Sequence, residues 1–185
     1  MVLLILGVLL WGATHSIRHT APSFRRGLED RQAKGLVTAA SLVAIILMVI
    51  GYRSAEWIPL YDLGSGAVYL NNILMVIAVA LMVASLAGSR VQNILRHPML
   101  TGLVLWAVAH LLIAGDLAAL ILFGGLSIWA LLTIALINRD EPLWTPPGGT
   151  LKGDLILVGL TAVIVAVVGY IHIWLGLAPF GVTTA

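Results

Sequence analysis

The sequence predicts an all-α polytopic membrane protein, a bundle of about six transmembrane helices. Of its 185 residues, 61% are hydrophobic and only 10% are charged, and the mean hydropathy of +1.07 lies far above the values of soluble domains. The apolar residues form separate runs that approach the roughly 20 residues of a helical span. The alternation of an outer-membrane barrel strand is missing, and unpaired backbone groups are too costly in lipid for any other structure than helices.

Six apolar runs place the expected helices. They lie near residues 1–16, 36–52, 66–88, 99–115, 117–137 and 154–176, and the first and fourth are short. The first run could be mistaken for a signal peptide, but it has no basic segment before it and no small-x-small cleavage pattern, so we expect it to remain as a helix. Pro146 and Pro147 exclude a helix from the polar connection that precedes the last run. We expect a single transmembrane domain over residues 1–185.

The basic residues predict the orientation of the bundle. Nine of the ten Lys and Arg residues fall in connections on one side of the predicted helices, and Arg53 alone falls on the other. Basic connections stay in the cytoplasm, so both termini are predicted to face the periplasm of a bacterial inner (plasma) membrane. The net charge of +2 then reflects topology, and contact with membrane lipid rather than nucleic acid is expected. The nine residues are Arg18, Arg25, Arg26, Arg31, Lys34, Arg90, Arg96, Arg139 and Lys152.

Several kinds of chemistry are excluded or disfavoured. The chain has no cysteine, which rules out disulfides, thiolate catalysis, thiolate metal ligands and covalent c-type haem. Every Asp and Glu falls in a connection or at a helix end, whereas proton-coupled carriers usually need carboxylates within their spans. The helices carry no Ser-His-Asp spacing and no glycine-rich phosphate loop, so hydrolases and kinases have no support. Histidine remains.

His15 and His110 are the strongest candidate ligands. A neutral imidazole within a span must find a hydrogen-bond partner or a metal. The helices that contain these two residues are expected to run in opposite directions, so the residues should reach a similar depth near the middle of the ~30 Å hydrocarbon core. Opposed imidazoles at one depth suit a bis-histidine haem b, one per chain.

The sequence around the two histidines is similar. Trp11 precedes His15 by one turn, Trp106 precedes His110 by one turn, and mostly small residues lie between. Each tryptophan should share the face of its histidine, and the small residues would let a flat macrocycle approach the helix, so both tryptophans are expected to flank the cofactor. The similarity also suggests an inverted repeat of helices 1–3 and 4–6.

The other histidines leave alternatives open. His172, near the outer end of the last helix, is an iron ligand (a third one, or the alternative to His15), a distal residue of the haem site, or an interface residue beside Trp174. His15 and His19 have the H-x-x-x-H spacing of a helical metal pair, although His19 falls at the boundary among arginines. Arg96 and His97 precede a proline suited to the first helical position, where they either bind an anionic group or mark the helix start. His97 and His110 lie ~20 Å apart on a helix and cannot share a metal.

Four stretches carry a resemblance to a known family: "THS" in the first helix, "AKGLVTAASLV" in the second, the long signature "LRHPMLTGLVLWAVAHLLIAGDLAALILFG", and the closing "HIWLG". With them the chain resembles the NnrU family and its plant and cyanobacterial relative, the zeta-carotene isomerase Z-ISO, over nearly its whole length. The resemblance implies a haem b protein linked to nitrite and nitric oxide metabolism in denitrification, or to haem-dependent cis-trans isomerisation of a polyene such as zeta-carotene. It also implies that His15 and His110 bind the iron and that His97 supports them.

The resemblance leaves the activity open. If the protein is an enzyme, it implies a haem-dependent isomerase or a nitrogen-oxide oxidoreductase, with an apolar polyene or nitric oxide as ligand and a membrane oxidoreductase as partner. A non-catalytic assembly factor for a nitric oxide reductase is a second class. A third follows from Arg96-His97-Pro98-x-x-x-Gly102, which is similar to the motif of membrane methyltransferases that bind S-adenosylmethionine. Here the tyrosine of that motif is Leu100, and the later paired glutamates are absent.

Overall fold

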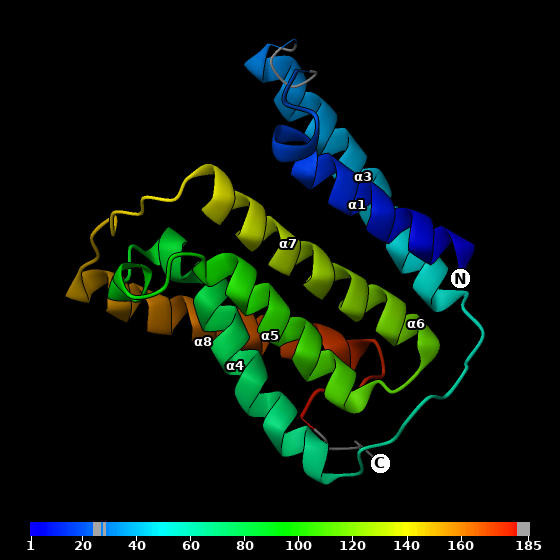
Figure 1. Cartoon of the computed structure of the whole chain (residues 1–185). Helices are drawn as coiled ribbons and strands as arrows, with labels where there is room; N and C mark the ends of the chain where they lie inside the picture. Colours follow the sequence, from blue (N-terminus) through cyan, green and yellow to red (C-terminus); the bar gives the residue numbers. More distant parts are fainter. Residues whose placement is uncertain (24–26, 28, 181–185) are drawn as a thin grey trace. The chain divides into compact units, whose positions relative to one another are not determined.

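The protein is all-helical in the residues that its computed structural model describes, 1–23, 27 and 29–180 (Figure 1). This confirms the predicted fold class. The last of the six predicted helices is a single α-helix, and the fifth, over residues 117–140, combines α-helical and π-helical segments. The helices are α1 (Val2–Thr20), α3 (Asp30–Arg53), α4 (Gly66–Ala87), α5 (Pro98–Ile113), α6 (Leu117–Ala119), π-helical η2 (Leu120–Gly124), α7 (Gly125–Asp140) and α8 (Leu151–Trp174), with a 3₁₀ turn η1 (Arg90–Asn93) before α5.

Within the described residues, five helical runs are long and apolar enough to cross a membrane: α1, α3, α4, the run 117–140 and α8. The apolar α5 has 16 residues and is ~24 Å long, which is short for a full span. Large apolar side chains of α3 are exposed on the protein surface, among them Leu42, Ile46 and Ile50. Exposed aliphatic side chains along a long helix belong in lipid, so this is a multi-pass membrane protein in contact with lipid.

The first two predicted helices were too short. α1 continues to Thr20 rather than stopping near residue 16, and α3 begins at Asp30 rather than near residue 36. At the start of α3, Glu29 and Gln32 form a reciprocal capping box. The predicted ends followed the apolar runs, but a helix ends where its backbone groups find caps, and polar residues can carry it beyond the hydrocarbon.

These longer helices change the predicted basic loop. Arg18 lies in α1, and Arg31 and Lys34 lie in α3, so three of its basic residues are helical. Arg25 and Arg26 fall outside the described residues. All other predicted helix ends agree with the structure to within three residues.

The chain divides into two compact units. The first comprises Met1–Tyr61 and Gly115–Trp129, and the second comprises Asp62–Ala114 and the chain from Ala130 onward. In the first unit α1 packs along α3 (Figure 1). A Cβ added to Gly51 would lie 2.3 Å from the backbone nitrogen of Leu4, so the two helix backbones touch here. Small residues at a helix crossing permit this close approach in membranes.

In the second unit α4 packs against both α5 and α8 (Figure 1). A Cβ at Gly102 of α5 would lie 2.7 Å from the carbonyl oxygen of Ala78 in α4. A Cβ at Gly153 of α8 would lie 2.1 Å from the carbonyl oxygen of Gly88, just after α4. Both interfaces therefore depend on glycine. The predicted inverted repeat stays a prediction, since it concerns the pairing of α1 with α5, which belong to different units.

Connections predicted to share a side of the membrane meet within each unit. In the first, the carbonyl oxygen of Gly115 accepts hydrogen bonds from the amides of Leu60 (2.8 Å) and Tyr61 (3.1 Å). In the second, the Gln92 side chain donates to the carbonyl of Gly148 at 2.7 Å. In each unit, two connections separated by two helices thus lie at the same end. This is what a chain that crosses a membrane back and forth requires.

Candidate functional site

The first candidate site is the turn of α1 from Trp11 to His15, here called the first histidine turn. His15 Nδ1 donates to the carbonyl oxygen of Trp11 at 3.0 Å. The Trp11 ring stacks on the imidazole with centroids 4.0 Å apart and an interplanar angle of 24°. The prediction that this tryptophan shares the face of its histidine is confirmed, because residues four apart on a helix lie one above the other.

Trp129 completes the first histidine turn from another helix. Its ring centroid lies 5.6 Å from that of His15 and 5.8 Å from that of Trp11, edge-on to both. Its indole Nε1 donates to Ser16 Oγ at 3.2 Å. The sequence analysis missed Trp129, since nothing in an apolar run shows which tryptophan meets a histidine of another helix.

The second histidine turn runs from Trp106 to His110 in α5. His110 Nδ1 donates to the carbonyl oxygen of Trp106 at 2.8 Å, and the two rings are tilted by 54° with centroids 4.7 Å apart. The Asn71 side chain of α4, only 3% exposed, donates to the carbonyl of Ala109 at 2.8 Å. That carbonyl belongs to the peptide bond joining Ala109 to His110. Asn71 was missed as well, although an amide in an apolar span is a recognisable signal of an interhelical bond; the sequence does not show whether Asn71 or its neighbour Asn72 makes it.

His172 lies in the second unit with His110. Its Nδ1 donates to the carbonyl of Val168 at 2.7 Å, the same bond to the preceding turn that His15 and His110 make. Both histidines thus belong to one compact unit. His15 belongs to the first unit, so its pairing with His110 stays a prediction.

The hydrogen bonds define the protonation of these three imidazoles. A carbonyl oxygen can only accept, so each Nδ1 carries the proton, and in a neutral ring the lone pair then resides on Nε2. Histidines that bind a metal through Nε2 usually donate Nδ1–H to a backbone carbonyl or a carboxylate in this way. Within the described chain, no three histidine or acidic side chains gather closely enough to hold a bare metal ion. A metal here would need ligands from another source, such as the nitrogens of a macrocycle.

The small residues next to the histidines serve helix packing. A Cβ on Gly12 would lie 3.5 Å from Trp129 Cδ1, in ordinary contact. Ala107 and Ala109 are fully buried, and Ala109 presents its carbonyl to Asn71. These residues therefore bring neighbouring side chains and helices close to the histidine turns.

Arg96 and His97 join the start of α5 to the end of α7. The His97 Nε2 donates to Asn138 Oδ1 at 2.9 Å, and the Arg96 guanidinium donates to the carbonyl of Glu141. Pro98 begins α5, as its fixed backbone angle favours. In the structure both side chains are engaged in protein contacts, which gives them a positioning role at this helix start.

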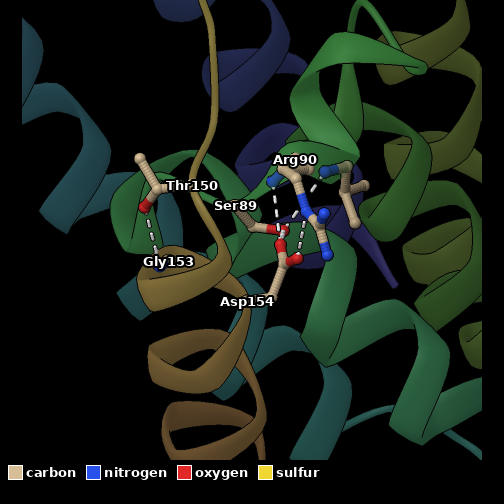
Figure 2. Close-up of polar contacts among 6 residues, drawn as sticks. Ser89, Arg90, Thr150, Gly153 and Asp154 are labelled. Atoms are coloured by element: carbon tan, nitrogen blue, oxygen red, sulfur yellow. Dashed lines mark hydrogen bonds and ion pairs between the residues drawn. The ribbon is translucent and has the colours of Figure 1, made fainter.

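A polar clasp closes the same end of the second unit (Figure 2). The carboxylate of Asp154 accepts from Ser89 Oγ at 2.8 Å, from the Arg90 amide at 2.9 Å and from Arg90 Nε at 2.6 Å. Thr150 caps α8 by accepting from the Gly153 amide at 2.9 Å. The donors and acceptors in this clasp satisfy one another, so we assign it to stability rather than to ligand binding.

The fold and these histidines define a class of protein: a multi-pass, all-helical membrane protein with imidazoles along three of its helices. Residues 3–179 match the family model described as NnrU protein. The chain therefore belongs to the NnrU family, which confirms the resemblance seen in the sequence. No curated protein and no solved structure matches it.

Proposed function

We propose that this NnrU-family protein binds one haem b within the membrane, and that His110 and His15 would hold its iron. The observation that carries the proposal is the shared geometry of the two histidine turns. In each, Nδ1 donates to a tryptophan carbonyl one turn back, so the ring lone pair resides on Nε2 and the ring is held by its own helix. Two imidazoles prepared in this way would each offer Nε2 to the iron of a haem.

The residues around His15 are chemically compatible with a porphyrin. Trp11 and Trp129 give it a broad aromatic surround, which suits the apolar faces of a macrocycle. The Trp11 Nε1 is buried and has no hydrogen-bond acceptor among the described residues. Buried N–H groups are normally satisfied, so this donor fits a bound group that brings an acceptor.

His172 is the alternative to His15 as second ligand. Its place in the same compact unit as His110 and its Nδ1 bond to the carbonyl of Val168 support this arrangement. His110 is a ligand in both arrangements. The variants His15→Ala and His172→Ala, described below, distinguish the two arrangements.

The haem would serve nitrogen-oxide metabolism in denitrification or the isomerisation of an apolar polyene. When bound, it would supply an iron that takes up nitric oxide, carries an electron or acts on a polyene from the lipid phase. The chain's own residues would hold the ligands and keep water from the iron. A reduced protein that ignores both nitric oxide and carbon monoxide would favour electron transfer to a membrane oxidoreductase.

The decisive experiment is the visible spectrum of the purified protein in mild detergent, oxidised and dithionite-reduced, with a pyridine haemochrome assay. We expect about one haem per chain and a Soret band that is lost or shifted in His110→Ala. Loss in His15→Ala but not in His172→Ala identifies the second ligand as His15, and the reverse identifies His172. Trp11→Leu and Trp106→Leu should shift the band if both rings flank the macrocycle.

A colourless protein from haem-replete cells would refute the haem proposal. A non-catalytic assembly factor for a nitric oxide reductase would then be the favoured function. A methyltransferase would instead bind S-adenosylmethionine near Arg96 and His97, and isothermal titration calorimetry that detects no heat of binding would remove it. The protein contacts of both side chains do not favour that function.

We further propose that the protein lies in a bacterial inner membrane with both termini in the periplasm. The connections that follow α4 and α7 meet at one end of the second unit, and they contain Arg90 and Arg96, with Lys152 at the start of α8; basic connections usually stay in the cytoplasm, which supports this orientation. Because the chain has no cysteine, single cysteines at the exposed Ser54 and Thr145 can be labelled without background. We expect a reagent added from the periplasm to label Ser54→Cys and not Thr145→Cys. The opposite pattern would show that the protein has the opposite orientation.

A further inference from the structure

Trp129 comes from outside α1 and makes a ring contact with the imidazole of His15. We propose that Trp129 is a positioning residue for His15, and that Ser16 fixes Trp129. The inference rests on the proposed role of His15 as an iron ligand. It concerns how the ring is held, which the family match does not address.

The contacts restrict the imidazole from several directions. Its Nδ1 is bound to the Trp11 carbonyl at 3.0 Å, and Trp11 stacks on its plane at 4.0 Å. Trp129 meets the ring edge-on, with 70° between the planes. A histidine ring turns mainly about its two side-chain torsions, so a hydrogen bond and two ring contacts leave a single favourable orientation of Nε2.

Trp129 is itself oriented by α1. Its Nε1 donates to Ser16 Oγ at 3.2 Å, and its Cδ1 would lie 3.5 Å from a Cβ added to Gly12. Residues 12 and 16 are one turn apart on α1, so they share a face with one another. Trp129 therefore lies over that face, and the residue after His15 in the chain determines how the indole is turned.

The arrangement resembles the outer shell of a metal site. Partners that orient a ligand are nearly as important as the ligand, because a freely turning imidazole must give up that freedom when it binds. Loss of such a partner typically lowers metal affinity about 10–100-fold. Trp129→Leu should therefore weaken haem binding about tenfold, while Ser16→Ala should have a smaller effect because the indole remains.

The test combines two measurements on the full-length protein in detergent. The first is NMR of protein with labelled histidine rings, prepared without haem, in which the His15 signal is assigned by its absence in His15→Ala. The second is haem titration followed by the Soret band. Trp129→Phe, which keeps a ring but loses the N–H, separates ring contact from the Ser16 bond.

Matched controls are present in the chain. Ser127→Ala removes a buried hydroxyl that has no hydrogen-bond partner among the described residues, and Trp174→Leu removes an exposed indole at the end of α8. We expect the His15 ring signal to shift and broaden in Trp129→Leu, to change less in Trp129→Phe and Ser16→Ala, and to stay unchanged in both controls. Circular dichroism checks that each variant remains folded.

The outcomes separate this inference from the haem proposal. An unchanged His15 signal in folded Trp129→Leu overturns the positioning role, whatever the spectrum shows. A changed signal with unaltered haem affinity overturns the link to the iron. A wild-type protein that binds no haem refutes the proposed function, and the ring signal then decides on its own whether Trp129 orients His15.

Discussion

The two histidine turns carry the same motif and are supported in different ways. Both place tryptophan four residues before histidine and both bind Nδ1 to the tryptophan carbonyl. In the first turn the two rings stack at 24° and Trp129 adds a third ring. In the second turn the rings are tilted by 54°, and the added contact is the Asn71 amide on the backbone of Ala109.

This difference shows which contacts of a histidine turn depend only on nearby residues of its own helix. The spacing of four residues within a helix is enough for the Nδ1 bond and for the contact between the two rings. The third partner comes from another helix, and it is aromatic in one case and an amide in the other. The first turn is thus held through its side chain and the second through its peptide bond.

The largest expected effect on the free energy of unfolding comes from the glycines where the helices of the two histidine turns pack on their neighbours. Gly51→Ala in α3 and Gly102→Ala in α5 each place a methyl group against the backbone of the facing helix, at 2.3 Å and 2.7 Å respectively. We expect each to lower the free energy of unfolding by about 1–3 kcal/mol, with the larger loss at Gly51. The measurement is unfolding in mixed micelles with increasing sodium dodecyl sulfate, followed by circular dichroism.

Gly35→Ala is the matched control for this comparison. Gly35 lies in α3 with no atom within 4 Å of an added Cβ, so alanine should stabilise the helix by about 0.5–1 kcal/mol. If Gly51→Ala were as stable as Gly35→Ala, the close approach of α1 and α3 would be wrong.

A smaller loss is expected where an amide supports the second turn. Asn71→Leu removes the buried bond to the Ala109 carbonyl and should cost about 0.6–1.7 kcal/mol, the range of hydrogen bonds between membrane helices. The same unfolding measurement applies, with the half-buried neighbour Asn72→Leu as control. Equal stability of the two variants would mean that the amide does not support the turn.

The smallest expected effect tests how far the two turns are interchangeable. Gly12 takes the place in the first turn that Ala107 takes in the second. An added methyl at Gly12 meets only Trp129 Cδ1, at an ordinary 3.5 Å. Gly12→Ala should therefore raise the free energy of unfolding by a few tenths up to about 1 kcal/mol, through helix propensity. A clear loss of stability would show that Trp129 lies closer to α1 than described.

Much of the fold could be predicted because composition and hydrophobic runs determine how many helices cross a membrane. The position of Pro98 at the start of α5 and the Trp–His contacts were also predictable, since both are local. The start of α3 was not, because capping by Glu29 and Gln32 places it before the apolar run, and the end of α1 was not, because polar residues such as Arg18 and His19 continue that helix. The π-helical turn Leu120–Gly124 was missed as well, since a π-helix has no distinctive composition.

What the sequence by itself determined is therefore the class of protein, the path of its helices, and two imidazoles with Nδ1 held by their own helix. Each of these depends on residues a few positions apart or on an apolar run. What only the tertiary structure decided is the third contact at each turn: Trp129 with Ser16 at His15, and Asn71 at Ala109. These contacts join residues 38 and 113 positions apart, and no local periodicity encodes which distant side chain fills a given space between helices.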